Sequence, residues 1–188
     1  KLIVIDLKSG EKLQEFNDPG FPAPPTWSPD GKKLVYVSFE SGKPEIFIQE
    51  VFSGQREAVT KYAGLNNAPV WSPDGRHLAM TLSKTGNPEI HVYSLQSSKL
   101  TQITHHPAID TEANWSPDGS KLVFTSDRGG RPQLYMVNMN GANKGSRPKR
   151  VTFEGEYNAR GVFSPDGSRL AMVHVERGLF RIAVLELE

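Results

Sequence analysis

The residues best suited to chemistry form one short cluster, in which His105 and His106 precede Asp110 and Glu112. Imidazole nitrogens and carboxylate oxygens are common metal ligands. Adjacent residues of an extended chain point to opposite sides, however, so the two histidines are poorly placed to bind one ion. We therefore expect no transition-metal site here. The two carboxylates could attract Ca²⁺, which prefers oxygen ligands, and this alternative stays open.

Other catalytic patterns are missing from the sequence. The chain has 188 residues and no cysteine, which excludes thiolate catalysis, disulfides and zinc sites built on cysteine. It contains no G-x-S-x-G nucleophile elbow and no Walker-type phosphate loop. His77, His91 and His174 lie in or beside predicted strands, so we expect structural roles for them. Apart from the open Ca²⁺ alternative, we predict no catalytic residue, metal or cofactor, and hence no enzyme.

Composition narrows the classes of partner. Hydrophobic residues make up 37% of the chain and charged residues 23%, and the net charge is +1. Basic residues are scattered among acidic ones, whereas nucleic-acid binding usually requires a basic patch. No apolar run approaches the roughly 18 residues of a membrane span, so we expect no membrane insertion. The first residues, KLIVIDL, have the pattern of a strand inside a fold, so we expect the gene product to begin earlier.

The strongest signal is a repeat. WSPDG begins at Trp27, Trp71 and Trp115, and FSPDG begins at Phe163, with separations of 44, 44 and 48 residues. The four extra residues fall between 140 and 150. A period of about 40–45 residues is typical of propeller blades with four strands.

Each repeat predicts four strands, for example A at 68–71, B at 77–82, C at 89–95 and D at 100–104. No stretch has a sustained helical period, so the fold class is all-β. SPDG reads as the A–B turn, because Pro, Asp and Gly each favour turn positions. The motif aromatic residue is expected to pack between neighbouring blades. The pentapeptide is therefore scaffold rather than a reaction centre.

The strand count indicates an incomplete ring. We assign the repeats to 1–20 (partial), 21–64, 65–108, 109–156 and 157–188 (partial) of a single domain, 1–188. The resulting 17 strands are not a multiple of four. We predict a β-propeller of four-stranded blades, about four of them present, forming an arc of a ring that has six or more. A four-bladed ring with one spare strand is the alternative. Exposed apolar end blades would favour dimerisation.

Several linking segments carry a specific resemblance. LNNAPVWSPDG (65–75), TSDRGGRPQ (125–133) and FEGEYNAR (153–160) resemble the TolB family, and the similarity extends over essentially the whole chain. These segments are more specific than WSPDG, which marks many propellers. TolB proteins are periplasmic propellers of the Tol–Pal system. The resemblance implies a six-bladed propeller behind an N-terminal α/β domain, of which this chain matches about the first four blades.

The resemblance also implies a function. Such proteins are non-enzymatic and bind the peptidoglycan-associated lipoprotein Pal through one face of the propeller. They help to maintain the outer membrane during cell division, and some colicins exploit them. They contact TolA through an extreme N-terminus that is absent here, so we expect no TolA binding by this chain.

The predicted binding face carries the D–A loops, at 61–67, 105–112 and 154–160, opposite the SPDG turns. These loops should converge on the central opening, and loops on a rigid frame commonly carry function. The residues that match the family before strand A are predicted to contact Pal: Leu65, Asn66, Asn67, Ala68, Asp110, Thr111, Glu112, Tyr157, Asn158 and Arg160. Alternatively, they cap their own loops. Asp127 and Arg128 of a B–C loop could reach a partner on the same face, but we expect them to form a solvated pair that stabilises by less than ~1 kcal/mol.

Two enzyme classes remain as alternatives. The repeats could form the gating propeller of a peptidase that resembles prolyl oligopeptidase, in which case a hydrolase domain would follow. They could also belong to a polysaccharide lyase that resembles oligogalacturonate lyase and holds a metal through axial histidines. The predicted A strands end in PPTW, APVW, EANW and RGVF and contain no histidine, which argues against the lyase.

Overall fold

The computed structural model describes residues 1–17, 24–140 and 147–187, and its regular structure is entirely β-strand. The junction predicted between the first two repeats, and most of the insertion predicted at 140–150, lie outside these ranges. The described residues contain no helix with the length and apolar character needed to cross a membrane.

The strands form five antiparallel sheets, each within one repeat. The N-terminal sheet contains β1 (Leu2–Ile5) and β2 (Lys12–Phe16). The first blade contains β3 (Thr26–Trp27), β4 (Lys33–Ser38), β5 (Glu45–Glu50) and β6 (Arg56–Ala58). The second blade contains β7 (Asn66–Trp71), β8 (His77–Leu82), β9 (Glu89–Ser94) and β10 (Leu100–Gln102).

The third blade contains β11 (Asp110–Trp115), β12 (Lys121–Ser126), β13 (Gln133–Asn138) and β14 (Lys149–Arg150). The C-terminal sheet contains β15 (Tyr157–Phe163), β16 (Arg169–Glu176) and β17 (Leu179–Glu186). In each complete blade, neighbours in the sequence pair with one another, as in a propeller blade.

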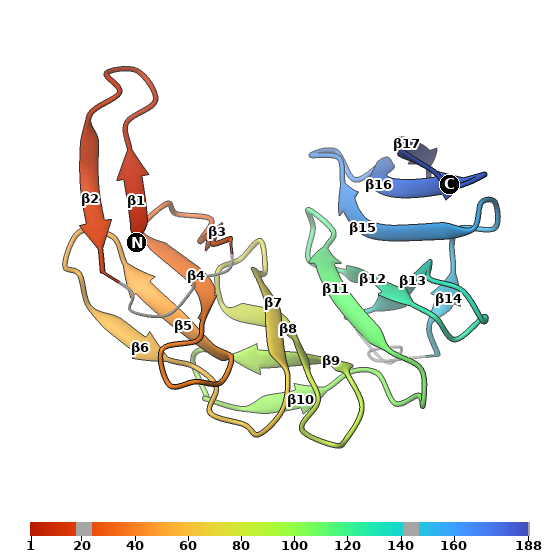
Figure 1. Cartoon of the computed structure of the whole chain (residues 1–188), viewed down its shortest axis with the longest axis horizontal. Coiled ribbons are helices and arrows are strands. Elements are labelled where there is room, and N and C mark those ends of the chain that lie inside the picture. Colours follow the sequence, from red (N-terminus) through yellow and green to blue (C-terminus); the bar gives the residue numbers. More distant parts are fainter. Residues whose placement is uncertain (18–23, 141–146, 188) are drawn as a thin grey trace.

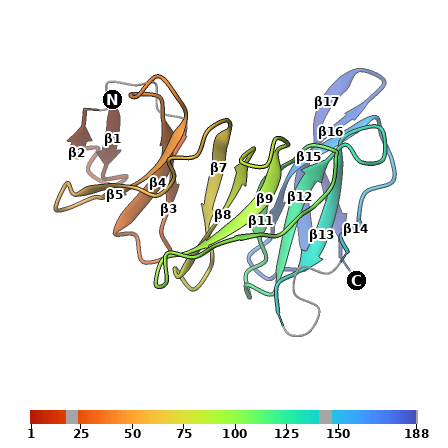
Figure 2. The ribbon, with the colours of Figure 1, turned by 90° about the horizontal axis from the view of Figure 1, so that it is seen from below.

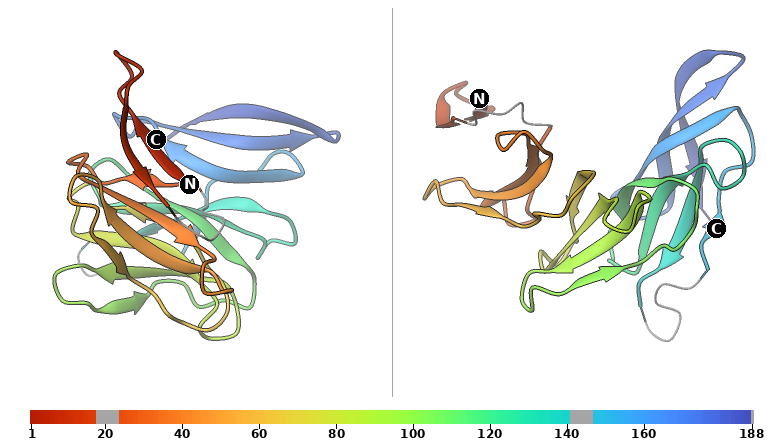
Figure 3. Two further views of the ribbon diagram at one scale, coloured as in Figure 1. Left: turned by 60° about the vertical axis from the view of Figure 1, so that its left-hand side comes forward. Right: turned by 60° about the horizontal axis from the view of Figure 1, so that its bottom comes forward.

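The sheets follow one another around an open arc (Figure 1). The first strands, β3, β7, β11 and β15, line the inside of the arc, and β6, β10 and β14 lie on its outside. Figure 2 shows the blades side by side, and the right-hand view of Figure 3 shows the N-terminal and C-terminal sheets at opposite ends of the arc. The predicted all-β propeller of four-stranded blades, present as part of a ring, is confirmed.

Apolar clusters between successive sheets hold the arc together. Val35 and Ile46 of the first blade share one cluster with Leu78 and Met80 of the second. Further clusters join the second blade to the third and the third to the C-terminal sheet. Strands β4, β8 and β12 are buried on both faces because each packs against two neighbouring sheets. This explains why their sequences are apolar without alternation.

The motif aromatic residues pack onto the preceding blade, but not equally. Trp115 is 9% exposed and belongs to the cluster between the second and third blades, and Trp71 packs against the corresponding cluster one blade earlier. Trp27 is 50% exposed, so the expectation that it is wedged between blades is wrong. The sheet before it contains two described strands, β1 and β2, whereas a complete four-stranded blade precedes each of Trp71 and Trp115.

The SPDG turns are built alike in all four copies. In the first, Ser28 Oγ donates to Asp30 Oδ1 at 2.6 Å, and the amide of Lys33 donates to Ser28 Oγ at 2.9 Å. Gly31 has a φ of 69°, which a residue with a side chain rarely adopts. Hydrogen bonds from the serine hydroxyl and a backbone amide lower the pKa of Asp118 and Asp166 to about 2. The predicted position of the pentapeptide at the A–B turn is confirmed.

The end of the arc exposes an apolar face. Phe180 is 76% exposed, Ile182 75% and Val184 61%, and all three lie on β17. The sequence predicts such a flank, and self-association through it stays a prediction.

Candidate functional site

The three inner strands β7, β11 and β15 share an irregularity at one repeat position. Pairing with the next strand shifts between Asn67 and Val70 in β7 and between Thr111 and Asn114 in β11. The same shift occurs between Ala159 and Val162 in β15. Such β-bulges re-aim side chains and often lie beside binding sites. Since these strands line the inside of the arc, the bulges lie together along its concave side (Figure 1).

Each bulge contains a residue in the left-handed conformation. The φ angles are 49° for Ala68, 56° for Glu112 and 56° for Arg160. None of the three is glycine or asparagine, the residues that adopt this conformation readily. For other residues the left-handed conformation costs about 1–2 kcal/mol each. The corresponding position in the first repeat is Pro24, whose ring excludes a positive φ. Repeated strain at one position points to a functional surface. We call the exposed and half-buried residues around these bulges the bulge face.

An ion pair joins two sheets across the bulge face. Arg160 Nε lies 2.9 Å from Glu112 Oε1, with side chains that are 70% and 26% exposed. The backbone amide of Arg160 donates to Thr125 Oγ1 at 3.1 Å, and that hydroxyl donates to Glu112 Oε2 at 3.3 Å. The pair thus holds the third blade to the C-terminal sheet while it presents a guanidinium group to solvent. An exposed pair of this kind stabilises by less than about 1 kcal/mol.

Three of the residues predicted to contact a partner are enclosed. Asn66, Asp110 and Asn158 occupy one repeat position and are 0%, 0% and 1% exposed. Asn66 Nδ2 donates to the carbonyl oxygens of Tyr62 and Gly64 at 2.9 and 3.2 Å, which closes its own D–A loop. The side chain of Asn66 is therefore a loop cap, as the alternative interpretation states, and contact of these three residues with a partner stays a prediction.

Asn158 links its loop to two neighbouring strands. Its Nδ2 donates to Gln133 Oε1 at 2.9 Å and to the carbonyl oxygen of Glu154 at 2.6 Å. Its Oδ1 lies 2.7 Å from Nδ1 of His174. Because Oδ1 accepts a hydrogen bond here, the ring of His174 donates from Nδ1 and has a structural role, as predicted.

Asp110 has an ionic partner that the sequence did not indicate. Arg128 Nη2 lies 2.6 Å from Asp110 Oδ2, and the Arg128 side chain is 12% exposed. The guanidinium carbon also lies 5.4 and 4.9 Å from the ring centres of Phe124 and Tyr135. Asp127 Oδ1 accepts a hydrogen bond from the amide of Ile109 at 2.8 Å. The expected solvated pair of Asp127 and Arg128 is therefore wrong, because both side chains tie the B–C loop to the D–A loop.

The remaining predicted residues form the bulge face. Asn67 and Arg160 are exposed, and the others are half-buried: Leu65, Ala68, Thr111, Glu112 and Tyr157. All but Leu65 lie on strands rather than in loops, because β7, β11 and β15 begin earlier than the sequence pattern indicates. Ile109 is 48% exposed and occupies the repeat position of Leu65 and Tyr157. Sequence reasoning missed Ile109, although the 44-residue register would have found it.

The structure gives the Ca²⁺ alternative no support. His106 Nδ1 accepts a hydrogen bond from the amide of Ala108 at 3.0 Å, and Asp110 and Glu112 each pair with their own arginine. Within 1–17, 24–140 and 147–187, no three His, Cys, Asp or Glu side chains are grouped so as to hold a metal ion.

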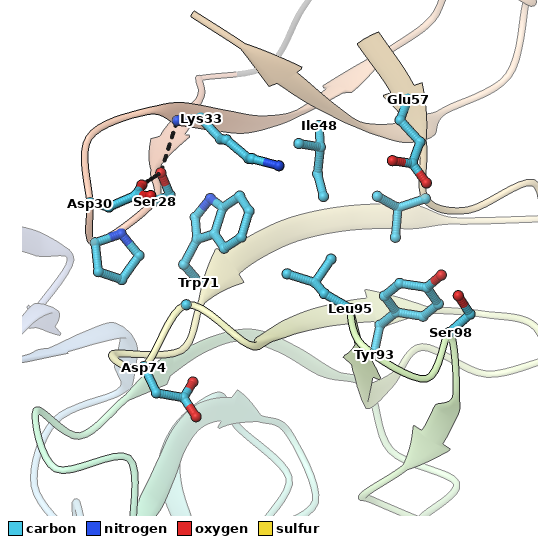
Figure 4. A pocket seen from close by; sticks show the side chains of 13 residues that line it. Ser28, Asp30, Lys33, Ile48, Glu57, Trp71, Asp74, Tyr93, Leu95 and Ser98 are labelled. Atoms are coloured by element: carbon cyan, nitrogen blue, oxygen red, sulfur yellow. Dashed lines mark hydrogen bonds between the residues drawn. The ribbon is translucent and has the colours of Figure 1, made fainter. Parts of the chain in front are cut away.

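The opposite side of the arc has a cleft of about 330 Å³ between the first and second blades (Figure 4). Its lining includes Lys33, Glu57, Trp71 and Tyr93, together with residues of two SPDG turns. None of the residues of the bulge face lines this cleft. The two features are therefore separate candidate surfaces.

Comparison with known proteins identifies one family throughout the chain. The family model described as the TolB beta propeller domain matches residues 5–188. The Tol-Pal system protein TolB of Xanthomonas campestris pv. campestris (strain B100) is 67% identical over 162 residues, which are 86% of this chain and 36% of that protein. The chain thus spans little more than a third of this relative's length.

Solved structures give the same result. The crystal structure of TolB from Acinetobacter baumannii matches with a TM-score of 0.86 at 40% identity, over 98% of this chain and 45% of that one. A puromycin hydrolase matches with a TM-score of 0.75 at 15% identity, over 96% of this chain and 29% of the hydrolase. At that identity the second likeness concerns the fold alone.

Proposed function

This chain belongs to the TolB β-propeller family, and from that premise we propose that it is a non-enzymatic periplasmic propeller that binds the lipoprotein Pal. Through that contact it helps to maintain outer-membrane integrity during cell division. The observation that carries the proposal is the row of strained bulges at Ala68, Glu112 and Arg160, because it repeats at the positions that resemble the family's binding segments.

The bulge face has the chemistry of a protein interface. Leu65, Ile109 and Tyr157 supply apolar or aromatic surface at one repeat position, and Arg160 supplies an exposed guanidinium group. Tyrosine and arginine are enriched among residues that dominate binding energy. The buried caps beneath them keep the frame rigid, which lowers the entropy cost of binding. Pal is proposed to contact this face, and colicins that exploit the system would meet the same residues.

Two further partner assignments are proposed, one from the family and one from the exposed end of the arc. TolA is bound through the extreme N-terminus of the family's full-length proteins, and we propose that this contact does not involve the propeller face described above. Self-association through Phe180, Ile182 and Val184 is proposed for the chain in isolation, and sedimentation equilibrium would detect it.

A gating propeller of a peptidase is the weaker candidate. The relatives at 67% and 40% identity are named TolB, whereas the likeness to the puromycin hydrolase is at 15% identity. Protein binding therefore accounts for this surface better than a role in peptide hydrolysis.

Calorimetric titration with purified Pal tests the proposal. Ala68→Arg and Thr111→Arg add bulk at the centre of the bulge face, and each should weaken binding at least tenfold, which corresponds to about 1.4 kcal/mol. Arg160 has the same repeat position and a similar φ to Ala68, so this backbone conformation accommodates arginine. Thr101→Arg on the outer strand β10 is the matched control and should bind normally. Unchanged Pal binding by both face variants, with unchanged melting temperatures, would exclude this face.

A further inference from the structure

The cleft on the side of the A–B turns is lined by polar, charged and apolar side chains, among them two aromatic rings. Ile48 and Val59 come from the first blade, and Trp71, Tyr93 and Leu95 come from the second (Figure 4). A similar but smaller cleft of about 240 Å³ lies beside Trp115, between the second and third blades. The groove itself therefore follows from the way in which blades pack.

Glu57 distinguishes the first cleft from the second. It stands on β6 and points its carboxylate into the cleft (Figure 4). The residue is exposed, and its carboxylate makes no hydrogen bond or ion pair with any residue of the described part of the chain. The same repeat position is Thr101 in the second blade and Lys149 in the third. A carboxylate without a protein partner, in a cleft that also contains aromatic rings, is suited to a cationic group.

The other charged groups of the lining already have partners. Lys33 Nζ lies 3.0 Å from Glu50 Oε1, so its positive charge is offset. Asp30 and Asp74 are bound within their own turns by Ser28 and Ser72. The lining thus contains three carboxylates and one ammonium group, and its charge is complementary to a cation.

We propose that this cleft binds an arginine side chain carried by a peptide segment of a partner protein. A planar guanidinium group can lie against the indole of Trp71 and form paired hydrogen bonds with the carboxylate of Glu57. Its aliphatic stem would cover Ile48 and Leu95. The site is separate from the bulge face and does not depend on Pal binding.

Nuclear magnetic resonance of the ¹⁵N-labelled chain tests this assignment. The three tryptophans, Trp27, Trp71 and Trp115, each give one indole N–H signal. The probe is the peptide acetyl-Gly-Arg-Gly-amide, and the same peptide with citrulline is the uncharged control. The arginine peptide should shift the Trp71 signal saturably and leave the other two in place, and the citrulline peptide should not shift it.

Two substitutions in the cleft and one control test whether the charge of the lining determines binding. Glu57→Gln should weaken binding about fivefold or more, because it removes the proposed ionic partner of the guanidinium. Glu156→Gln, an exposed carboxylate on a D–A loop, is the charge-matched control and should not change it. Lys33→Gln should strengthen binding, because it removes the only cation of the lining.

Three results would overturn the proposal: equal shifts at Trp71 and Trp115, equal binding of the citrulline peptide, or unchanged binding by Glu57→Gln. Equal binding of a lysine peptide would overturn the assignment to arginine. Because the assay contains no Pal, failure of the proposed function would leave the Trp71 titration unchanged.

Discussion

Arg128→Ala should destabilise the fold strongly, although the residue stands in a surface loop. Its guanidinium is the ionic partner of Asp110, whose side chain is completely buried. The other carboxylate oxygen, Oδ1, is buried and has no hydrogen-bond partner among the described residues. Removal of Arg128 would therefore leave a buried charge uncompensated. Loss of one partner from a buried pair costs about 3–5 kcal/mol.

Urea unfolding followed by tryptophan fluorescence measures this change. Arg160→Ala is the matched control, because that arginine is 70% exposed and its loss should cost less than about 1 kcal/mol. A second substitution, Asp110→Asn, should recover much of the stability lost in Arg128→Ala, since a neutral amide is cheaper to bury. Asparagine already occupies this repeat position at Asn66 and Asn158.

The reasoning fails if Arg128→Ala destabilises no more than Arg160→Ala. It also fails if Asp110→Asn gives no recovery in the Arg128→Ala background. If Arg128→Ala alone does not fold, a folded double variant supports the account and an unfolded one contradicts it.

Three further predictions concern the scaffold. Trp115→Ala should cost about 3–5 kcal/mol in urea unfolding and Trp27→Ala less than about 1, because only the first is enclosed between blades; similar losses would refute the packing described here. Burial lowers the pKa of His91 below 6.5, so on acidification the unfolded chain gains a proton before the folded one. The free energy of unfolding should therefore fall as the pH drops below about 6.5. In His91→Phe the loss of stability between pH 7 and 5 should be smaller. The hydrogen bond from Ser116 holds the pKa of Asp118 at about 2, against 3.8 in an unperturbed carboxyl. The ionised carboxylate therefore contributes its full stabilisation above pH 3.8, and this stabilisation is lost as the pH falls through 2. Asp118→Asn should lower stability at neutral pH and make stability less dependent on pH in the acid range, as urea unfolding at several pH values would measure.

Sequence periodicity was sufficient to predict the frame. The predicted strand 77–82 coincides with β8, because a strand buried on both faces is apolar throughout and ends at a turn. The inner strand before it was predicted to start at 68, whereas β7 starts at Asn66. The difference arises from the bulge at Ala68, which has a left-handed backbone conformation. The sequence gives no sign of this conformation, because the residue is neither glycine nor asparagine.

The sequence predicted where the candidate residues lie in the fold, but it did not predict which of their side chains are buried. The register predicted that the three segments lie side by side, since equivalent positions of a repeat lie at equivalent places in each blade. It did not reveal that Asn66, Asp110 and Asn158 are enclosed, because polar residues in a presumed loop are normally exposed. The partner of Asp110 is Arg128, 18 residues away, and only the folded arrangement of two loops brings them together.

The most direct test of the central claim uses the absence of cysteine from the chain. A single cysteine can be introduced at Asn67, on the bulge face, or at Gln96, exposed beyond β9 on the side of the A–B turns, and labelled with an environment-sensitive fluorophore. Titration with Pal should change the emission of the label at position 67 saturably and leave the label at position 96 unchanged. A response at position 96 alone, or at neither position while calorimetry detects binding, would contradict the assignment of the bulge face as the partner-binding surface.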